Sequence, residues 1–337
     1  MQSAIKPVKW GVLSTAKIGT QKVIPAMQKG AFSEVAAIAS RNLATAKQAA
    51  AELGIPKAYG SYEELLADPE IEAIYNPLPN HLHVPWSAKA AEAGKHVLCE
   101  KPLALTAAEA QNLIEVRDRA GVLMQEAFMV RHHPQWLRAR ELVRSGRIGD
   151  LRAIQCFFSY MNRDAANIRN LADIGGGAIY DIGCYPVTVS RFLFDSEPTR
   201  VVSLIERDPD FKTDRLSSAI LDFPAGQASF VCSTQLVPYQ RAQIFGTKGR
   251  IEIQIPFNAP PDKPCRLFVD DGSELGDVSA QTETFDVTDQ YTLQAEVFSH
   301  AIRSGEALEF RLENGVQNMR ILDALFRSAQ KNGWEKV

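Results

Sequence analysis

The sequence predicts an α/β protein in which a doubly wound parallel sheet is followed by an α+β domain with a large, mostly antiparallel open sheet. Three observations carry this prediction. Up to about residue 126, short apolar runs alternate with longer helical stretches, as in parallel strands joined by crossover helices. From residue 151 onward, several runs alternate apolar and polar residues, which favours antiparallel strands with one covered face. The length of 337 residues favours two domains over a single core.

The first half is expected to contain short apolar strands and helices with clear start signals. Strands are expected at Val8–Leu13, Val35–Ala39, Ile71–Tyr75, His96–Cys99 and Val122–Glu126. Helices are expected over Ile18–Lys29, where Pro25 must start or kink the helix, and over Ala44–Leu53. The spacing of a capping box predicts further helix starts at Ser61 and Thr106.

The second half is expected to place most of its strands in one antiparallel sheet and two helices at the end of the chain. Strands are expected at Leu151–Ser159, Val201–Ile205, Ser217–Phe223, Ala228–Ser233 and Gly249–Ile255. Helices are expected over about Gly176–Phe194, Leu293–Ser304 and Glu313–Ala329. We place the first domain at residues 1–126 and the second at residues 127–337, with the change to the antiparallel pattern following near Gly146–Asp150. The last helix can pack back on the first domain.

Composition and charge bound the kinds of protein that this chain can be. A hydrophobic content of 45% and a charged content of 23% are those of an ordinary soluble globular protein. A net charge of −3 gives no electrostatic reason to expect a nucleic acid or an anionic membrane as a partner. No apolar run is long enough for a signal peptide or a membrane span, and the five cysteines are scattered without a C-x-x-C pair. Reduced thiols in the cytoplasm are therefore expected, rather than disulfides or a cysteine zinc site.

The turn after the first strand has the spacing of a dinucleotide-binding turn, although two of its glycines are replaced. The fingerprint G-x-G-x-x-G would place glycines at 14, 16 and 19, and the chain has Ser14, Ala16 and Gly19. Both replacements are small, so a pyrophosphate can still approach the backbone N–H groups at the start of the helix. The alternative is a tight strand-to-helix turn that binds no ligand. Together with the alternating strands and helices, this turn predicts a Rossmann-type domain.

The end of the second strand indicates which dinucleotide would bind. NAD sites usually carry Asp or Glu about twenty residues after the glycine turn, where the carboxylate holds the ribose hydroxyls. This chain has Ser40 and Arg41 there. A carboxylate would repel a 2′-phosphate, whereas a hydroxyl and a guanidinium can bind one, so NADP(H) is preferred and NAD(H) is the second choice. The alternative is that Arg41 is a solvated surface charge.

Glu100-Lys101-Pro102, at the end of an apolar run, is the most informative short motif. The run from Gly94 to Cys99 is expected to lead into a buried strand. A lysine just beyond the carboxyl end of a parallel strand lies where open α/β sheets bind ligands. Pro102 stops the strand, so Lys101 cannot join the ladder. The alternative is an ordinary structural lysine at a strand end.

The histidines are not expected to bind a metal. His81 and His83 follow Asn80, which can cap the next helix. Their spacing turns the two rings to opposite sides of a strand, or about 200° apart on a helix, so the rings do not converge on one ion. The adjacent His132 and His133 diverge for a similar reason. We therefore predict no metal site.

Three glycines and a helix that carries Asp181 and Tyr185 form the second informative segment. The glycines Gly175–Gly177 permit close packing of the helix start against another element or a ligand. Asp181 and Tyr185 are i and i+4, so they lie on one helical face. Oxidation of an alcohol needs a hydride acceptor and a group that takes the hydroxyl proton. A tyrosine can take that proton when a nearby ammonium such as Lys101 lowers its pKa, and Asp181 can orient a substrate hydroxyl or the lysine. The alternative is ordinary packing for the ring and a first-turn helix charge for the carboxylate.

Together, these segments resemble the glucose–fructose oxidoreductase / myo-inositol dehydrogenase (Gfo/Idh/MocA) family over nearly the whole chain. The most specific matches are Gly94–Pro102 and Gly175–Tyr185, and Pro79-Asn80-x-x-His83 is also family-like. Tyr185, where many members have histidine, is similar to the branch of glucose–fructose oxidoreductase, NADP-linked D-xylose dehydrogenase and dimeric dihydrodiol dehydrogenase. The resemblance implies that Lys101 and Tyr185 are catalytic and that Asp181 assists. It also implies cofactor contacts at or near Ser14, Thr15, Ala16, Ile18, Ser40, Arg41, Leu78, Asn80, His83, Glu100, Lys101 and Arg169.

The resulting prediction is an NADP(H)-dependent oxidoreductase that transfers a hydride between nicotinamide and a sugar or polyol. Oxidation of an aldose such as D-xylose to its lactone is the best single expectation, and a trans-dihydrodiol dehydrogenase and a keto-sugar reductase are the alternatives. A non-catalytic dinucleotide sensor is the alternative from a different class, although a sensor has no need of Lys101 and a proton-transferring Tyr185. A homodimer formed through the C-terminal sheet is expected.

Overall fold

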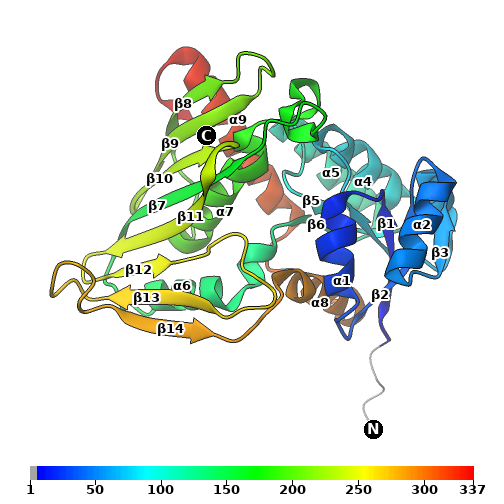
Figure 1. Ribbon diagram of the computed structural model, residues 1–337, viewed down its shortest axis with the longest axis horizontal. Helices are drawn as coiled ribbons and strands as arrows, with labels where there is room; N and C mark the ends of the chain where they lie inside the picture. The colour runs from blue at the N-terminus through cyan, green and yellow to red at the C-terminus, as the bar shows by residue number, and fades with distance from the viewer. Residues whose placement is uncertain (1–5) are drawn as a thin grey trace, which may run out of the picture. The chain divides into compact units, whose positions relative to one another are not determined.

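The structure is a computed structural model that describes residues 6–337; residues 1–5, which open the expected first domain, lie outside the described residues. The chain forms two units, each with its own sheet (Figure 1). The first unit runs to Met129 and also contains Tyr291–Met319, and the second comprises Val130–Gln290 and Arg320–Val337. The predicted fold class, an α/β chain with a parallel sheet and a mostly antiparallel sheet, is confirmed.

The first unit is built on a six-stranded sheet with the order β3-β2-β1-β4-β5-β6, in which every strand pair is parallel. Its strands are β1 (Val8–Leu13), β2 (Ser33–Ala39), β3 (Lys57–Tyr59), β4 (Ala73–Asn76), β5 (His96–Glu100) and β6 (Met124–Ala127). The strand order reverses between β1 and β4, and doubly wound folds bind ligands beyond the carboxyl ends of the strands at such a reversal. The loops after β1, β2, β4 and β5 are therefore the candidate ligand-binding loops of this unit.

The helices of the first unit largely start where the sequence predicts. They are α1 (Ile24–Met27), α2 (Leu43–Leu53), α3 (Tyr62–Ala67), α4 (His83–Glu92), α5 (Ala107–Ala120), α8 (Gln290–Ser304) and the first part of α9 (Leu312–Lys331). Both capping boxes are confirmed, because Ser61 Oγ accepts the N–H of Glu64 and Thr106 Oγ1 accepts the N–H of Glu109, each at 3.2 Å. The predicted cap by Asn80 is wrong: a 3₁₀ turn precedes α4, whose N-cap residue Leu82 makes no side-chain cap bond.

The core of the first unit joins β1 to a helix from the far end of the sequence. Trp10 and Phe298 are fully buried, and their ring centroids lie 5.6 Å apart. Trp10 Nε1 donates to Ser299 Oγ at 3.0 Å, which satisfies the only donor of the indole. Burial of a phenylalanine side chain contributes about 1.5–3 kcal/mol. Most of α8 thus belongs to the first unit, although the strands of the second unit lie between β1 and α8 in the sequence.

The second unit is built on a nine-stranded sheet with the order β14-β13-β12-β11-β7-β10-β9-β8-β15. Its strands are β7 (Leu151–Met161), β8 (Arg200–Arg207), β9 (Asp214–Phe223), β10 (Gly226–Ser233), β11 (Gln235–Gly246), β12 (Arg250–Ile253), β13 (Cys265–Asp270), β14 (Gln281–Phe285) and β15 (Glu335–Lys336). β7 and β10 pair in parallel, and the other pairs are antiparallel. Its helices are α6 (Pro134–Arg144), α7 (Cys184–Phe194) and the second part of α9.

The strand β11 lies beside β7 near the middle of this sheet, and the sequence pattern does not predict it. Pro238 interrupts the run, and proline within a run argues against a central strand. The structure accommodates it in an irregularity, because the register with β7 shifts between Gln235 and Tyr239. Regular pairing with β7 then runs from Tyr239 to Phe245.

The two faces of the second sheet differ in what covers them. α7 and α9 lie on one face (Figure 1), and Ser203 of β8 bonds to α9 twice, from its N–H to Ser328 Oγ at 2.9 Å and from its Oγ to the Leu325 carbonyl at 2.6 Å. On β7, Cys156 is buried and the neighbouring Gln155 is exposed, as expected when successive side chains point to opposite faces. The second face of the sheet is open among the described residues.

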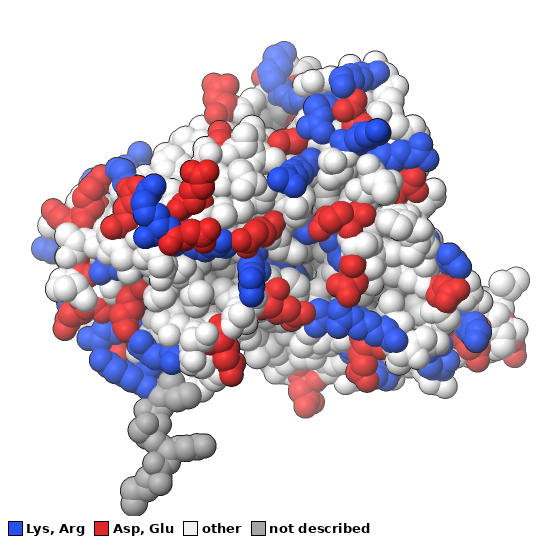
Figure 2. Space-filling model, turned by 180° about the vertical axis from the view of Figure 1, so that it is seen from behind, with Lys and Arg blue, Asp and Glu red and all other residues white. Residues whose placement is uncertain are grey.

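The surface carries charges of both signs. On the face shown in Figure 2, Lys and Arg side chains are interspersed with Asp and Glu side chains. Within residues 6–337, no helix combines the length and the apolar character needed to span a membrane.

Candidate active site

The turn after β1 keeps the backbone of a glycine turn without its first two glycines. Ser14 has a φ of +72°, in the left-handed region that glycine favours. Its hydroxyl accepts the N–H of Ala16 at 3.3 Å, a local bond that helps serine hold this backbone. Thr15, Ala16 and Ile18 are partly exposed beside it, and a π-helical turn, Gly19–Val23, follows. The turn thus offers small side chains where the fingerprint places a pyrophosphate.

β2 ends with Ser40 and Arg41 at the same edge of the parallel sheet. Ser40 is half-buried, and its hydroxyl accepts the N–H of Asn42 at 3.4 Å. Asn42 in turn caps α2 by accepting the N–H of Ala44 at 2.9 Å. The Arg41 side chain is exposed, and its charge opposes the rise that burial causes in the pKa of Tyr62. A hydroxyl and a guanidinium therefore lie where an NAD site would carry a carboxylate.

His83 connects two of the candidate loops through its ring. The side chain is 1% exposed, with Nδ1 2.7 Å from the Pro102 carbonyl oxygen and Nε2 2.7 Å from the Leu78 carbonyl oxygen. Burial lowers the pKa of His83 to about 4, although both carbonyls favour the protonated ring. Leu78 is buried and Asn80 is half-buried. Since both ring nitrogens face backbone carbonyls, His83 can act on a cofactor only through the positions of Leu78 and Pro102.

Lys101 follows β5 at this edge and is half-buried. Before it, Glu100 Oε1 accepts the hydroxyl of the fully buried Tyr75 at 2.6 Å. Burial raises the pKa of Tyr75 well above its usual value, so the phenol remains a donor. After it, the N–H of Leu103 donates to Oε1 of the buried Glu126 at 2.9 Å. Anchored residues on either side thus fix the backbone that presents Lys101.

In the second unit, two side chains converge on one oxygen of Asp181. Tyr160, at the end of β7, donates its hydroxyl proton to Asp181 Oδ2 at 2.5 Å, and Arg169 Nε donates to the same oxygen at 2.8 Å. The side chain of Asp181 is 13% exposed and that of Arg169 is 39% exposed. The charge of Asp181 raises the pKa of Arg169; burial, and then Asp181, raise the pKa of Tyr160. At neutral pH a neutral phenol and a charged guanidinium therefore face Asp181.

Tyr185 lies four residues after Asp181, near the junction of a π-helical turn and α7. Asp181 belongs to the turn Ile179–Gly183, and Tyr185 belongs to the first turn of α7. Tyr185 is 5% exposed, and its ring centroid lies 5.8 Å from that of Phe158 and 5.5 Å from that of Phe257. The negative charge of a Tyr185 phenolate would attract the Arg169 guanidinium, and this attraction is a further cause of the raised pKa of Arg169. Because the attraction is mutual, the guanidinium stabilises the phenolate.

The glycines before this helix bring Asp214 against its first turn. Gly177 has a φ of +121°, and a Cβ there would lie 1.9 Å from Asp214 Oδ1. Asp214 Oδ2 accepts the N–H of Ile179 at 2.6 Å. A Cβ on Gly176 would lie 2.6 Å from the carbonyl oxygen of Arg169. Asp214 is buried, and burial raises its pKa to about 6. The glycines therefore serve close packing of the helix start.

The structure divides the predicted site residues between the two units. Those at the carboxyl edge of the parallel sheet or in the loops after it are Ser14, Thr15, Ala16, Ile18, Ser40, Arg41, Leu78, Asn80, His83, Glu100 and Lys101. Arg169, Asp181 and Tyr185 belong to the second unit, where Arg169 is paired with Asp181. Four residues that support these side chains were not expected from the sequence: Tyr75, Glu126, Tyr160 and Asp214. The one available signal for Tyr160 is its place at the end of an expected strand; the other three lack a motif that marks them.

Two further features bear on the chemistry. In the part of the chain that the structure describes, there is no group of three or more His, Cys, Asp or Glu side chains arranged to hold a metal ion. All five cysteines are buried thiols that form no disulfide.

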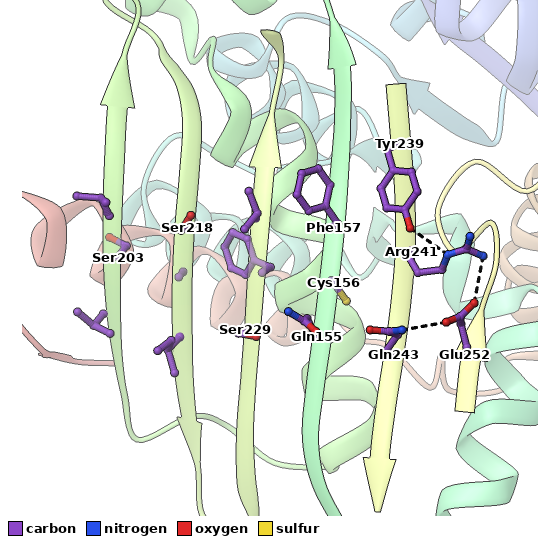
Figure 3. A pocket seen from close by; sticks show the side chains of 16 residues that line it. Gln155, Cys156, Phe157, Ser203, Ser218, Ser229, Tyr239, Arg241, Gln243 and Glu252 are labelled. Carbon is purple, nitrogen blue, oxygen red and sulfur yellow. Dashed lines mark hydrogen bonds and ion pairs between the residues drawn. The ribbon is translucent and has the colours of Figure 1, made fainter. Parts of the chain in front are cut away.

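A groove of about 660 Å³ lies on the open face of the second sheet (Figure 3). Gln155, Phe157 and Tyr239 project into it from β7 and β11. Because successive side chains of a strand point to opposite faces, the groove lies across the sheet from α7, which carries Tyr185. It is therefore separate from the cluster around Asp181.

Comparison with known proteins places the chain among enzymes. Residues 8–128 match an oxidoreductase-family domain with an NAD-binding Rossmann fold, and residues 136–252 match the GFO/IDH/MocA C-terminal domain. The chain is 52% identical to the uncharacterized oxidoreductase ORF334 of Rhizobium meliloti, over 98% of this chain and 99% of the relative. It is 42% identical to D-xylose 1-dehydrogenase (NADP(+)) 2 of Haloferax volcanii, over 95% of this chain and 97% of the relative.

A solved structure agrees with these matches. The 3-ketoreductase KijD10 of Actinomadura kijaniata, in complex with NADP and TDP-benzene, has a TM-score of 0.89 and 28% identity, covering 96% of this chain and 98% of that chain. The predictions of the family and of an enzyme rather than a sensor class are confirmed. The chain belongs to the GFO/IDH/MocA family of oxidoreductases and is an NAD(P)-dependent enzyme.

Proposed function

We propose that this oxidoreductase is an NADP(H)-dependent sugar dehydrogenase that oxidises an aldose such as D-xylose to its lactone. One observation carries the proposal: Tyr185, which can move a proton, lies one helical turn after Asp181, whose carboxylate is held by Arg169. Lys101, Tyr185 and Asp181 are proposed to act on one substrate. The identity to a D-xylose 1-dehydrogenase over nearly the whole of both chains supports an aldose.

NADP(H) is proposed as the preferred cofactor and NAD(H) as the second choice. The left-handed backbone at Ser14 and the small side chain of Ala16 fit a pyrophosphate, and Ser40 and Arg41 fit a 2′-phosphate. The Haloferax relative is named for NADP(+), and the KijD10 structure contains NADP. The proposed cofactor contacts are those expected from the sequence, with His83 acting through Leu78 and Pro102, and with Arg169 assigned to the Asp181 cluster.

The proposed reaction oxidises the anomeric carbon of the sugar. Bound nicotinamide would accept the hydride that leaves this carbon. The hydroxyl group on the same carbon gives its proton to Tyr185 as the carbon–oxygen double bond of the lactone forms. To act as this base, Tyr185 must first be a phenolate, and the guanidinium of Arg169 favours that form. We propose that the ammonium of Lys101 favours it further and orients the reacting hydroxyl.

A keto-sugar reductase, the activity named for KijD10, and a dihydrodiol dehydrogenase are the alternative reactions of the same site. A nucleotide-linked sugar carries a diphosphate, which needs cations around it. Arg169 already uses its Nε donor and balances its charge on Asp181, which leaves less of its guanidinium for a phosphate. This pairing favours a free sugar over a nucleotide sugar.

The experiment is a screen of NADPH formation by the purified protein, with NADP⁺ or NAD⁺ and a panel of aldoses, polyols and dihydrodiols. Turnover of an aldose with NADP⁺ is expected, and Tyr185→Phe should lower kcat by about 10²- to 10⁴-fold because it removes the proton acceptor. Lys101→Ala should also lose most turnover. Binding of NADP(H) without turnover of any substrate in either direction would favour the dinucleotide sensor, and turnover of dihydrodiols alone would replace the aldose.

We also propose that two copies of the chain associate through the open face of the nine-stranded sheet. Leu204 is 75% exposed on this face, Ile220 is 39% exposed and Tyr239 is 47% exposed. At one edge of the groove, Arg241 pairs with Glu252 at 3.3 Å (Figure 3). A two-fold-related copy would present the same two opposite charges, so a positive group of one copy can face a negative group of the other. The face is therefore complementary to itself.

The mass of the protein in solution tests this assembly. Light scattering should give the mass of two chains, and Leu204→Glu should give the mass of one chain, because a charge would be buried in the interface. The matched control is Leu275→Glu, at a residue 95% exposed in the loop between β13 and β14. A single-chain mass for the unaltered protein would contradict the proposal.

A cytoplasmic location is proposed from the thiols. All five cysteines are buried thiols outside any disulfide, which suits a reducing compartment.

A further inference from the structure

We propose that Tyr160 is a positioning residue of the active site, which holds the Asp181 carboxylate in the orientation that binds a hydroxyl group of the sugar. The inference rests on the proposed function, because it concerns the same substrate. Tyr160 belongs to none of the sequence motifs that mark Lys101, Asp181 and Tyr185.

The geometry of the cluster fixes one carboxylate from two directions. The Tyr160 hydroxyl donates to Asp181 Oδ2 at 2.5 Å, and Arg169 Nε donates to that same oxygen at 2.8 Å. Two donors on one oxygen define both the position of the carboxylate and its rotation about the side chain. A carboxylate held in this way accepts a substrate hydroxyl without having to be ordered when the sugar binds.

The two donors differ in how firmly the chain holds them. Tyr160 lies near the end of β7, which pairs with β10 on one side and β11 on the other. Arg169 lies in a short 3₁₀ turn, Ile168–Asn170, whose start is capped by Asn167 through the N–H of Arg169 at 3.1 Å. Side chains on sheet strands are placed more precisely than those on loops. Tyr160 is therefore the donor that sets the orientation, and Arg169 supplies the balancing charge.

The same surroundings separate the roles of the two tyrosines near Asp181. Burial, and then the charge of Asp181, raise the pKa of Tyr160, so its phenol keeps its proton and cannot serve as a base. Tyr185, by contrast, interacts favourably with Arg169 when it is a phenolate. Tyr160 thus acts on the reaction through Asp181 only.

The test compares Tyr160→Phe with a matched variant, Tyr59→Phe. In the first unit the Tyr59 hydroxyl donates to Asp68 Oδ2 at 2.7 Å, and Lys57 Nζ donates to the same oxygen at 2.8 Å. Both changes therefore remove a phenol from a carboxylate that a cation also holds. Tyr59 has no place in the proposed site, so its variant reports the cost of losing such a bond elsewhere in the fold.

Tyr160→Phe should raise KM for D-xylose about tenfold, the size expected for a hydrogen bond to a charged group, with a smaller fall in kcat. The pH dependence of kcat should keep its position, since Tyr185 remains the base. Isothermal titration should show weaker binding of the sugar to the NADPH complex, with the Kd for NADPH unchanged. Tyr59→Phe should change none of these quantities. In an Asp181→Ala background, where no side-chain oxygen remains to be oriented, Tyr160→Phe should have no further effect on KM.

The outcomes separate this inference from the proposed function. If the unaltered enzyme turns over an aldose and Tyr160→Phe matches Tyr59→Phe, the positioning role is overturned and the function stands. A shifted pH profile, or an undiminished effect in the Asp181→Ala background, would also overturn it. Absence of turnover by the unaltered enzyme with every aldose would overturn the proposed function, and this role of Tyr160 with it.

Discussion

Replacement of Gly177 by alanine should destabilise the second unit far more than an ordinary glycine-to-alanine change. Gly177 has a φ of +121°, and a Cβ there would lie 1.9 Å from Asp214 Oδ1. A left-handed backbone costs a residue with a Cβ about 1–2 kcal/mol. The carboxylate must also move, which weakens its 2.6 Å bond from the N–H of Ile179. A hydrogen bond to a charged group contributes about 1.5–3 kcal/mol, so the total loss should be about 2.5–5 kcal/mol.

The matched control is Gly146→Ala, in the same unit. Gly146 also has a left-handed φ, +72°, but a Cβ there would meet nothing within 4 Å, so this change should cost only about 1–2 kcal/mol. Urea denaturation followed by circular dichroism measures both losses. Because the helix that starts here carries Asp181 and Tyr185, kcat should fall for Gly177→Ala and stay unchanged for Gly146→Ala. Equal losses of stability in the two variants would refute the reasoning.

Three further predictions concern single side chains. The free energy of unfolding should fall as pH rises from about 4 to 6, because the folded state keeps the Asp214 proton up to a pKa of about 6 whereas the unfolded chain releases it near 3.8. In urea titrations at several pH values, Asp214→Asn should remove about 3 kcal/mol of this dependence, and an unaltered slope would contradict the buried-carboxyl argument. Ser14→Gly should bind NADP⁺ as well as the unaltered enzyme does. Ser14→Val, with a branched side chain at a φ of +72°, should lower the unfolding free energy by about 1–3 kcal/mol and weaken NADP⁺ binding. Equal NADP⁺ binding by the two variants in fluorescence titrations would count against the left-handed turn. Arg41→Ala should raise the Kd for NADP⁺ about tenfold and leave that for NAD⁺ unchanged, and an equal effect on both would argue against a 2′-phosphate contact.

Local signals were sufficient for the parts of the fold that local contacts determine. Ser61 and Thr106 cap the helices that their spacing predicts, because each bond joins residues three positions apart. β11 could not be predicted in the same way, since Pro238 breaks its pattern and pairing with β7 restores the strand around an irregularity. The π-helical turns at Gly19–Val23 and Ile179–Gly183 were also missed, because the sequence pattern there is that of an ordinary helix.

The same distinction holds within the site. Lys101 and Tyr185 each have a marker in their own segment, a strand-ending motif in one case and a glycine run before a helix in the other. Tyr160 meets Asp181 across 21 residues of sequence, and Asp214 meets Ile179 across 35. These contacts depend on the pairing of β7, β10 and β9, which no local pattern specifies. Side chains that work through such pairing become visible only in the folded chain.

The most direct test of the central claim follows the hydrogen that leaves the sugar. The purified enzyme is given NADP⁺ and D-xylose that carries deuterium on its anomeric carbon, and the reduced cofactor is analysed by mass spectrometry. Oxidation to the lactone predicts that deuterium appears in NADPH and that Tyr185→Phe slows its appearance by about 10²-fold or more. Unlabelled NADPH would show that another carbon is oxidised, and no NADPH from any aldose in the panel would contradict the assignment as an aldose dehydrogenase.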